Sequence, residues 1–69
     1  MDRADAVAIL KEMLKQNANP DMIGLKKITS DSYELHIKPQ VLSVAEIKLI
    51  AERHNFQIKE DNGLVIVFS

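Results

Sequence analysis

Two stretches of this sequence share one layout, in which a helical segment is followed by a hairpin whose second strand alternates apolar and polar residues. Residues 24–37 align without a gap on residues 55–68. The alignment places the apolar residues of one second strand on those of the other, Tyr33, Leu35 and Ile37 on Leu64, Ile66 and Phe68. A helix–hairpin unit used twice constrains the architecture strongly, although it specifies no chemistry.

Size and composition limit the class of protein. The 69 residues predict a single domain over residues 1–69, near the lower limit for a core without a metal or crosslink. The absence of cysteine excludes disulfides and favours a reducing compartment, which we expect to be the cytoplasm. The longest apolar run, residues 64–68, is too short to cross a bilayer, and the charged residues 1–5 do not resemble a signal peptide. We therefore expect no membrane association.

The net charge is also informative. Nine lysines and arginines nearly balance ten aspartates and glutamates, giving a net charge of −1. Proteins that bind nucleic acids or anionic membranes nonspecifically usually carry an excess of basic residues. The net charge therefore disfavours both functions.

Helical patterns occupy about residues 2–17 and 43–54. The first helix is expected to end before Pro20, which starts a short extra turn with Asn19 as its cap. In the second, Ser43 and Glu46 form a capping box, and Asn55 takes the left-handed position that closes the helix. Leu49 points away from its inward arc.

The register of each hairpin follows from the apolar pattern. For the second hairpin, a two-residue loop would mix polar and apolar residues on each face. A three-residue loop, Asp61 to Gly63, instead pairs Ile58 with Ile66, so we predict that register. In the first hairpin we expect Ile28 opposite Tyr33 across residues 29–32, which places Lys27 opposite Glu34 on the outer face.

Together these elements predict an α+β fold, a two-layer sandwich of order α-β-β-α-β-β. Its four-stranded antiparallel sheet carries both helices on one face. The predicted core contains these side chains: Val7, Leu10, Met13, Leu14, Ile28, Tyr33, Leu35, Ile37, Ile47, Ile50, Phe56, Ile58, Leu64, Ile66 and Phe68.

This arrangement leaves a few aliphatic side chains outside. Val65, Val67 and Leu25 are predicted on the outer sheet face, and Leu49 on the exposed side of the second helix. Scattered exposed aliphatics are normal in monomers. Alternatively, these four residues bind a protein partner, most simply a second copy that forms a homodimer, since unprotected strand edges tend to associate.

The sequence shows no catalytic constellation. It lacks a glycine-rich phosphate loop and a nucleophile elbow, and the Asp61–Gly63 stretch has the character of a turn rather than a calcium loop. His54 is expected to bond carbonyls at the end of its helix, and His36 to lie solvated on the outer sheet face. We therefore expect no enzyme activity, metal, cofactor or small-molecule substrate.

A basic sheet face is the remaining possibility. Lys27, His36, Lys38 and Lys59 are predicted to share the outer face, where four-stranded sheets bind single-stranded nucleic acid. Such sheets usually expose aromatic rings for base stacking, whereas Tyr33 and both phenylalanines are predicted inward. The leading expectation is thus a non-enzymatic interaction or accessory domain that self-associates through its sheet, and the alternative is a nucleic-acid-binding or regulatory module.

Overall fold

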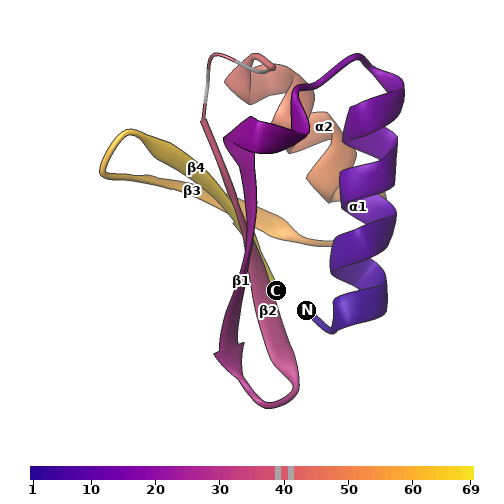
Figure 1. Ribbon diagram of the computed structural model, residues 1–69, viewed down its shortest axis with the longest axis vertical. Helices are drawn as coiled ribbons and strands as arrows, with labels where there is room; N and C mark the ends of the chain where they lie inside the picture. The colour runs from indigo at the N-terminus through magenta and orange to yellow at the C-terminus, as the bar shows by residue number, and fades with distance from the viewer. Residues whose placement is uncertain (39, 41) are drawn as a thin grey trace.

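The computed structural model describes residues 1–38, 40 and 42–69 and confirms the predicted α+β order α-β-β-α-β-β (Figure 1). Its elements are α1 (Arg3–Lys15), the short 3-10 turn η1 (Pro20–Met22), β1 (Ile23–Thr29), β2 (Ser32–Ile37), α2 (Val44–Arg53), β3 (Gln57–Asp61) and β4 (Leu64–Phe68).

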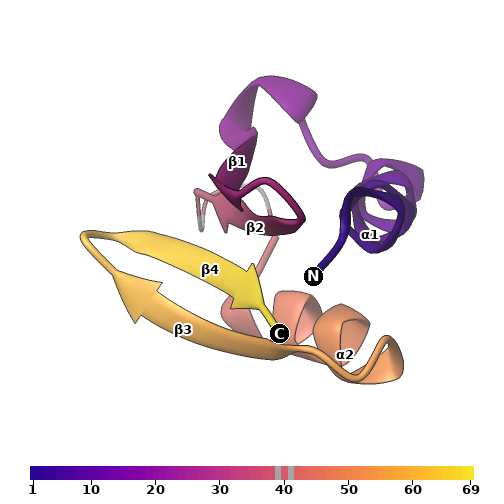
Figure 2. The same cartoon turned by 90° about the horizontal axis from the view of Figure 1, so that it is seen from below.

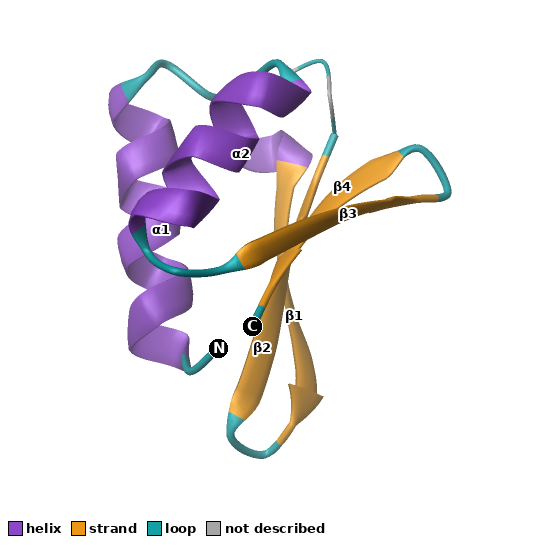
Figure 3. Ribbon diagram, turned by 180° about the vertical axis from the view of Figure 1, so that it is seen from behind, coloured by secondary structure: helices purple, strands orange, loops and turns teal. Residues whose placement is uncertain are grey.

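The four strands form one antiparallel sheet in the order β1-β2-β4-β3, so β1 and β3 are its edges. Both helices lie on one side of this sheet (Figure 3). α1 packs against β2 and α2, whereas α2 also packs against β3 and β4, an arrangement that is clear from below (Figure 2). The two helices therefore contact β2, β3 and β4, and they leave the edge strand β1 largely uncovered.

The ends of the helices follow the local sequence signals. The Glu46 N–H donates to the Ser43 hydroxyl at 3.2 Å, which confirms Ser43 as the N-cap of the predicted capping box. The Glu46 carboxylate accepts from that same hydroxyl at 3.0 Å. Asn55 has a φ of 62° and closes α2 in the left-handed region, as predicted. The predicted turn at Pro20 is also present, because the Asp21 N–H donates to the Asn19 side chain at 3.0 Å.

The face that α1 buries differs from the prediction. Ala6, Ile9 and Met13 are completely buried, whereas Leu14, assigned to the core, is 38% exposed. Val7 and Leu10 are only half-buried. The buried stripe of α1 therefore lies to one side of the predicted apolar arc.

The predicted register of the second hairpin is wrong. Asp61 lies opposite Leu64, so the loop has two residues, Asn62 with a φ of 52° and Gly63 with a φ of 76°. Two successive positive φ values define a type I′ turn, which suits the twist of the flanking strands and strongly favours Asn-Gly. The local turn preference therefore overrides the apolar pattern, and every side chain of β4 is turned to the other face.

The first hairpin is also shifted by one residue from the prediction. Lys27 lies opposite Tyr33 and Lys26 opposite Glu34, while Thr29 pairs with Ser32 across a two-residue loop. The ladder is irregular between residues 27 and 29, and this bulge accommodates Ile28, which is 47% exposed rather than in the core.

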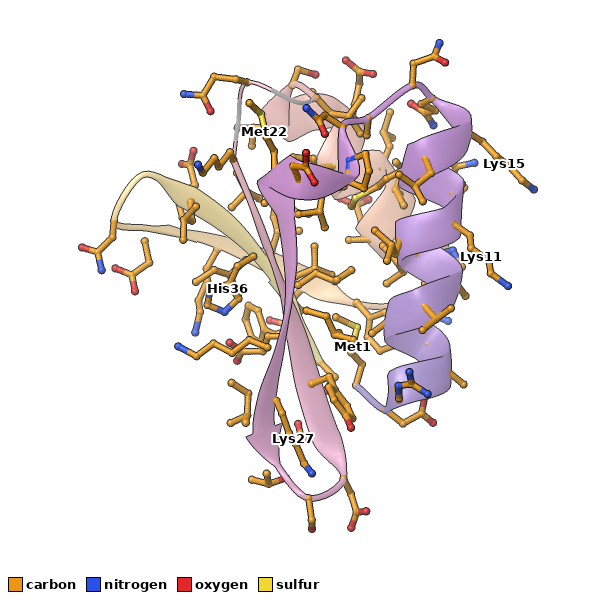
Figure 4. The ribbon with its side chains drawn as sticks, viewed as in Figure 1. Met1, Lys11, Lys15, Met22, Lys27 and His36 are labelled. Carbon is orange, nitrogen blue, oxygen red and sulfur yellow. The ribbon has the colours of Figure 1, made fainter. Side chains whose placement is uncertain are left out.

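The core is continuous between the helices and the inner sheet face. It contains Met1, Ala6, Ile9, Met13, Ala18, Leu35, Ile37, Leu42, Ile47, Ile50, Ala51, Val65 and Val67. Met1 lies between α1 and the sheet (Figure 4). Tyr33 N–H donates to the Met1 carbonyl at 2.7 Å, and the Met1 ammonium donates to the Tyr33 carbonyl at 3.3 Å. Met1 therefore extends the sheet beside β2, just beyond the end of β4.

Candidate interaction surfaces

Val65 and Val67, predicted to form an exposed apolar patch on the outer sheet face, are both 0% exposed. Val65 lies opposite Ile37, and Val67 lies opposite Leu35, so both point inward with these core residues. The proposed outer valine patch does not exist. Its error follows directly from the wrong register of the second hairpin, since a shift of one residue exchanges the two faces of a strand.

The outer face instead carries the other three side chains of β4, Leu64, Ile66 and Phe68. Ile66 is only 4% exposed even though no helix lies on this side, because His36 and Lys59 flank it on the neighbouring strands. The Lys59 ammonium lies 4.8 Å from the centre of the Phe68 ring, a cation–π contact. Long polar side chains therefore cover most of this apolar surface with their stems.

The four predicted nucleic-acid-binding residues do not share one face. Lys27 lies opposite Tyr33 and points to the inner side, at the edge of the sheet. His36 is on the outer side, away from the helices (Figure 4), and contacts the Glu34 carboxylate at 3.2 Å. Lys59 contacts Phe68, and Lys38 follows the end of β2. The predicted basic stripe is thus reduced and partly neutralised.

Leu25 and Leu49 are exposed, but in different places. Leu25 lies opposite Leu35 on the inner face, not on the predicted outer face, and is 40% exposed because β1 is an edge strand. Leu49 is 62% exposed on the outer side of α2, as predicted. The four residues that were proposed as one partner-binding group are therefore two core valines and two separate surface leucines.

The free edge of β1 exposes backbone groups as well as side chains. The backbone groups of Tyr33 bond to Met1, so they point away from β1. In an antiparallel ladder, bonded and non-bonded pairs alternate, so Ile23, Leu25 and Lys27 direct their N–H and C=O groups outward. Within the described chain no strand pairs with this edge.

Exposed apolar side chains lie on β1 and on one flank of α1. Three of the four large exposed ones are Leu14, Leu25 and Ile28. Glu12 faces α2 through its contacts with Arg53 and His54. Leu14 lies two positions further along the helix, or about 200° around it, and so belongs to the opposite flank, toward β1. The β1 side is consequently the least covered apolar region of the described structure.

The opposite edge, β3, borders a groove of about 440 Å³. The groove lies between α2 and β3, and its walls comprise Val44, Lys48, Glu52, Phe56, Gln57 and Ile58. Val44, Phe56 and Ile58 are half-buried and pack against the core. A second hollow follows the exposed side of α1 from Arg3 to Lys11, but only this helix lines it, so it has no second wall.

One polar cluster joins the two helices. The Glu12 carboxylate accepts a hydrogen bond from His54 Nε2–H at 2.8 Å and pairs with the Arg53 guanidinium at 2.7 Å. The hydrogen bond from His54, followed by the charge of Arg53, lowers the pKa of Glu12 despite partial desolvation. His54 therefore bonds a side chain of α1 rather than the helix carbonyls expected from sequence. The cluster lacks a nucleophile, and its geometry is that of a structural contact.

No group of three histidine, cysteine, aspartate or glutamate side chains in residues 1–38, 40 and 42–69 is arranged to hold a metal ion. Neither described helix is both long and apolar enough to cross a membrane. Comparison of the chain with protein families, with curated proteins and with solved structures gives no match.

Sequence reasoning missed two features of these surfaces. The outward position of Ile66 and Phe68 was signalled by Asn62-Gly63, the strongest short-range hairpin signal, but the apolar alternation was given more weight. The Glu12–His54 contact joins residues 42 positions apart and leaves no local signal.

Proposed function

We propose that this chain is a non-enzymatic protein-interaction domain, and that it self-associates by pairing β1 with β1 of a second copy. The observation that supports this proposal is the unpaired edge of β1, where Leu25 is 40% exposed beside outward-facing backbone groups. Such an edge is a template for another strand. The cysteine-free composition is compatible with a cytoplasmic location.

Charge favours one register for this pairing. If Leu25 lies opposite Leu25 of the second copy, Lys26 faces Gly24 of that copy and Lys27 faces Ile23. A register centred on Lys26 would instead place two like charges opposite each other, which destabilises an antiparallel pair. The symmetric Leu25 register therefore combines apolar contact at its centre with separated lysines, and the long Lys27 stem packs along Ile23 while its ammonium stays in solvent.

Replacement of Leu25 by lysine tests whether the chain self-associates through β1. Sedimentation velocity over a concentration series should show a monomer–dimer equilibrium for the wild type, and Leu25→Lys should remain folded and monomeric. The matched control is Leu49→Lys, because Leu49 is more exposed but lies on α2 far from the edge. A wild type that stays monomeric at high concentration, or a dimer lost with Leu49→Lys instead, would refute β1 pairing.

One observation supports a second candidate, nucleic-acid binding. Phe68 lies on the outer face with Lys59 and His36, so this face carries one aromatic ring, contrary to the prediction from sequence. One aromatic ring gives little surface for base stacking. Glu34 beside it and the net charge of −1 also disfavour contact with phosphates. Fluorescence anisotropy with mixed-sequence oligonucleotides at low salt tests it, since binding should disappear with Phe68→Leu.

A further inference from the structure

We propose that the groove between α2 and β3 binds an extended polypeptide segment, which adds a strand to the free edge of β3. The occupant is a segment of another protein with apolar side chains at alternate positions and a basic residue at one end of that pattern. This site lies on the opposite edge of the sheet from β1 and does not depend on self-association there.

The backbone of β3 provides the first argument. Leu35 and Ile37 direct their backbone groups toward Val67 and Val65, so these two valines face β2 rather than β3. Their partners on β3 are Ile58 and Glu60. The N–H and C=O groups of Ile58 and Glu60 therefore point to the free edge, where an extended backbone satisfies all of them.

The groove supplies the side-chain contacts. A strand laid beside β3 turns every second side chain toward α2, as in other peptides that bind by strand addition. There it meets the half-buried Val44, Phe56 and Ile58. Lys48 and Glu52 form the helix side of the groove, with their charged ends 4.0 Å apart and exposed to solvent. The floor is thus apolar and the rim polar.

Phe56, which directly precedes β3, and Ile58 and Glu60 on the inner face of β3 define the pattern of the occupant. Phe56 and Ile58 each favour an apolar residue opposite them, and Glu60 favours a lysine or arginine. Antiparallel addition is the more stable arrangement. The segment therefore reads basic, any residue, apolar, any residue, apolar, from its amino end to its carboxyl end.

A second copy of β3 fits this edge poorly. Antiparallel pairing centred on Lys59 places two lysines opposite each other, and pairing centred on Glu60 does the same for two glutamates. Pairing centred on Ile58 leaves Glu60 opposite Phe56 of the other copy. Each of these three registers contains a like-charge or charge–apolar pair. Pairing centred on Gln57 would need the Phe56 N–H, which already donates to the Ala51 carbonyl. A different segment with the pattern above avoids these pairs.

The test uses a defined peptide and amide NMR of the labelled chain. The probe is a short peptide with blocked ends that contains the sequence Lys-Thr-Val-Thr-Val, with threonine at the positions where any residue is allowed. Titration should shift the amide signals of Ile58 and Glu60 and slow their hydrogen exchange. Replacing the probe lysine with glutamate should weaken binding about fivefold, and N-methylation of the residues facing β3 should abolish it.

Two variants and one control localise the site. Val44→Gln should weaken binding about fivefold to tenfold by removing apolar contact, whereas Leu49→Gln, on the same helix but outside the groove, should leave it unchanged. Glu60→Pro removes an N–H that the β4 ladder does not use, so the folded variant should lose binding. The proposal is overturned if the probe shifts β1 amides instead, if Glu60→Pro binds normally, or if no shift appears at millimolar probe.

Discussion

Glu12 on α1 and His54, the C-cap of α2, meet at 2.8 Å, which ties the end of the second helix to the last turn of the first. Arg53 binds the other oxygen of the same carboxylate at 2.7 Å. The contact joins the two helices on the side of α1 that faces α2.

This contact predicts a pH-dependent stability. The pKa of Glu12 is lower in the folded chain than its ordinary value of 4.5, so the stabilisation is complete above that value and is lost as the pH falls through the folded pKa. Glu12→Gln should lower the free energy of unfolding at about pH 7, and the difference from wild type should shrink at about pH 3. Urea unfolding at both pH values measures this. The exposed Glu52→Gln serves as the control, and a constant Glu12→Gln effect across pH would contradict the prediction.

Two glycines should respond differently to alanine. Gly63 has a φ of 76° in the type I′ turn, so Gly63→Ala should lower the free energy of unfolding by about 1–2 kcal/mol. A β-carbon at Gly24 would meet the His36 carbonyl at 3.8 Å, an ordinary contact, so Gly24→Ala should be neutral or slightly stabilising. Chemical denaturation of both variants compares the two sites. Equal effects would mean that the turn geometry is wrong.

The register of β4 is tested by lysine substitutions on its two faces. Val67 is 0% exposed, so Val67→Lys buries an unpaired charge and should prevent folding, as seen by circular dichroism. Leu64 is half-buried on the outer face, where a lysine ammonium reaches water, so Leu64→Lys should still fold. The reverse result would support the three-residue loop predicted from sequence.

The capping box should contribute measurably to α2. Ser43→Ala removes the acceptor of the Glu46 N–H and should lower the free energy of unfolding by about 1 kcal/mol. Ser30→Ala, in the exposed loop between β1 and β2, should change it by less than about 0.5 kcal/mol. Thermal melts of the two variants provide the comparison, and similar melting temperatures would argue against the cap.

The elements of this fold were predictable because their signals are local. Ser43, Asn19 and Asn55 mark helix boundaries through bonds or backbone angles that involve only nearby residues. Local turn preferences also predict Asn62-Gly63 as a two-residue turn. The strand that follows, Leu64 to Phe68, is apolar at every position. Alternation cannot choose the inner face of such a strand, and relying on it reversed the candidate surface.

By itself, the sequence determined that two hairpins form one antiparallel sheet and that two helices cover one of its faces. These features follow from apolar periodicity and helix capping, which act within a few residues. The tertiary structure alone decided that Val65 and Val67 belong to the core, that His54 binds Glu12, and that Leu25 stands at an uncovered edge. Those outcomes depend on strand order and on the limited width of two helices, and these are set by contacts between residues far apart in the chain.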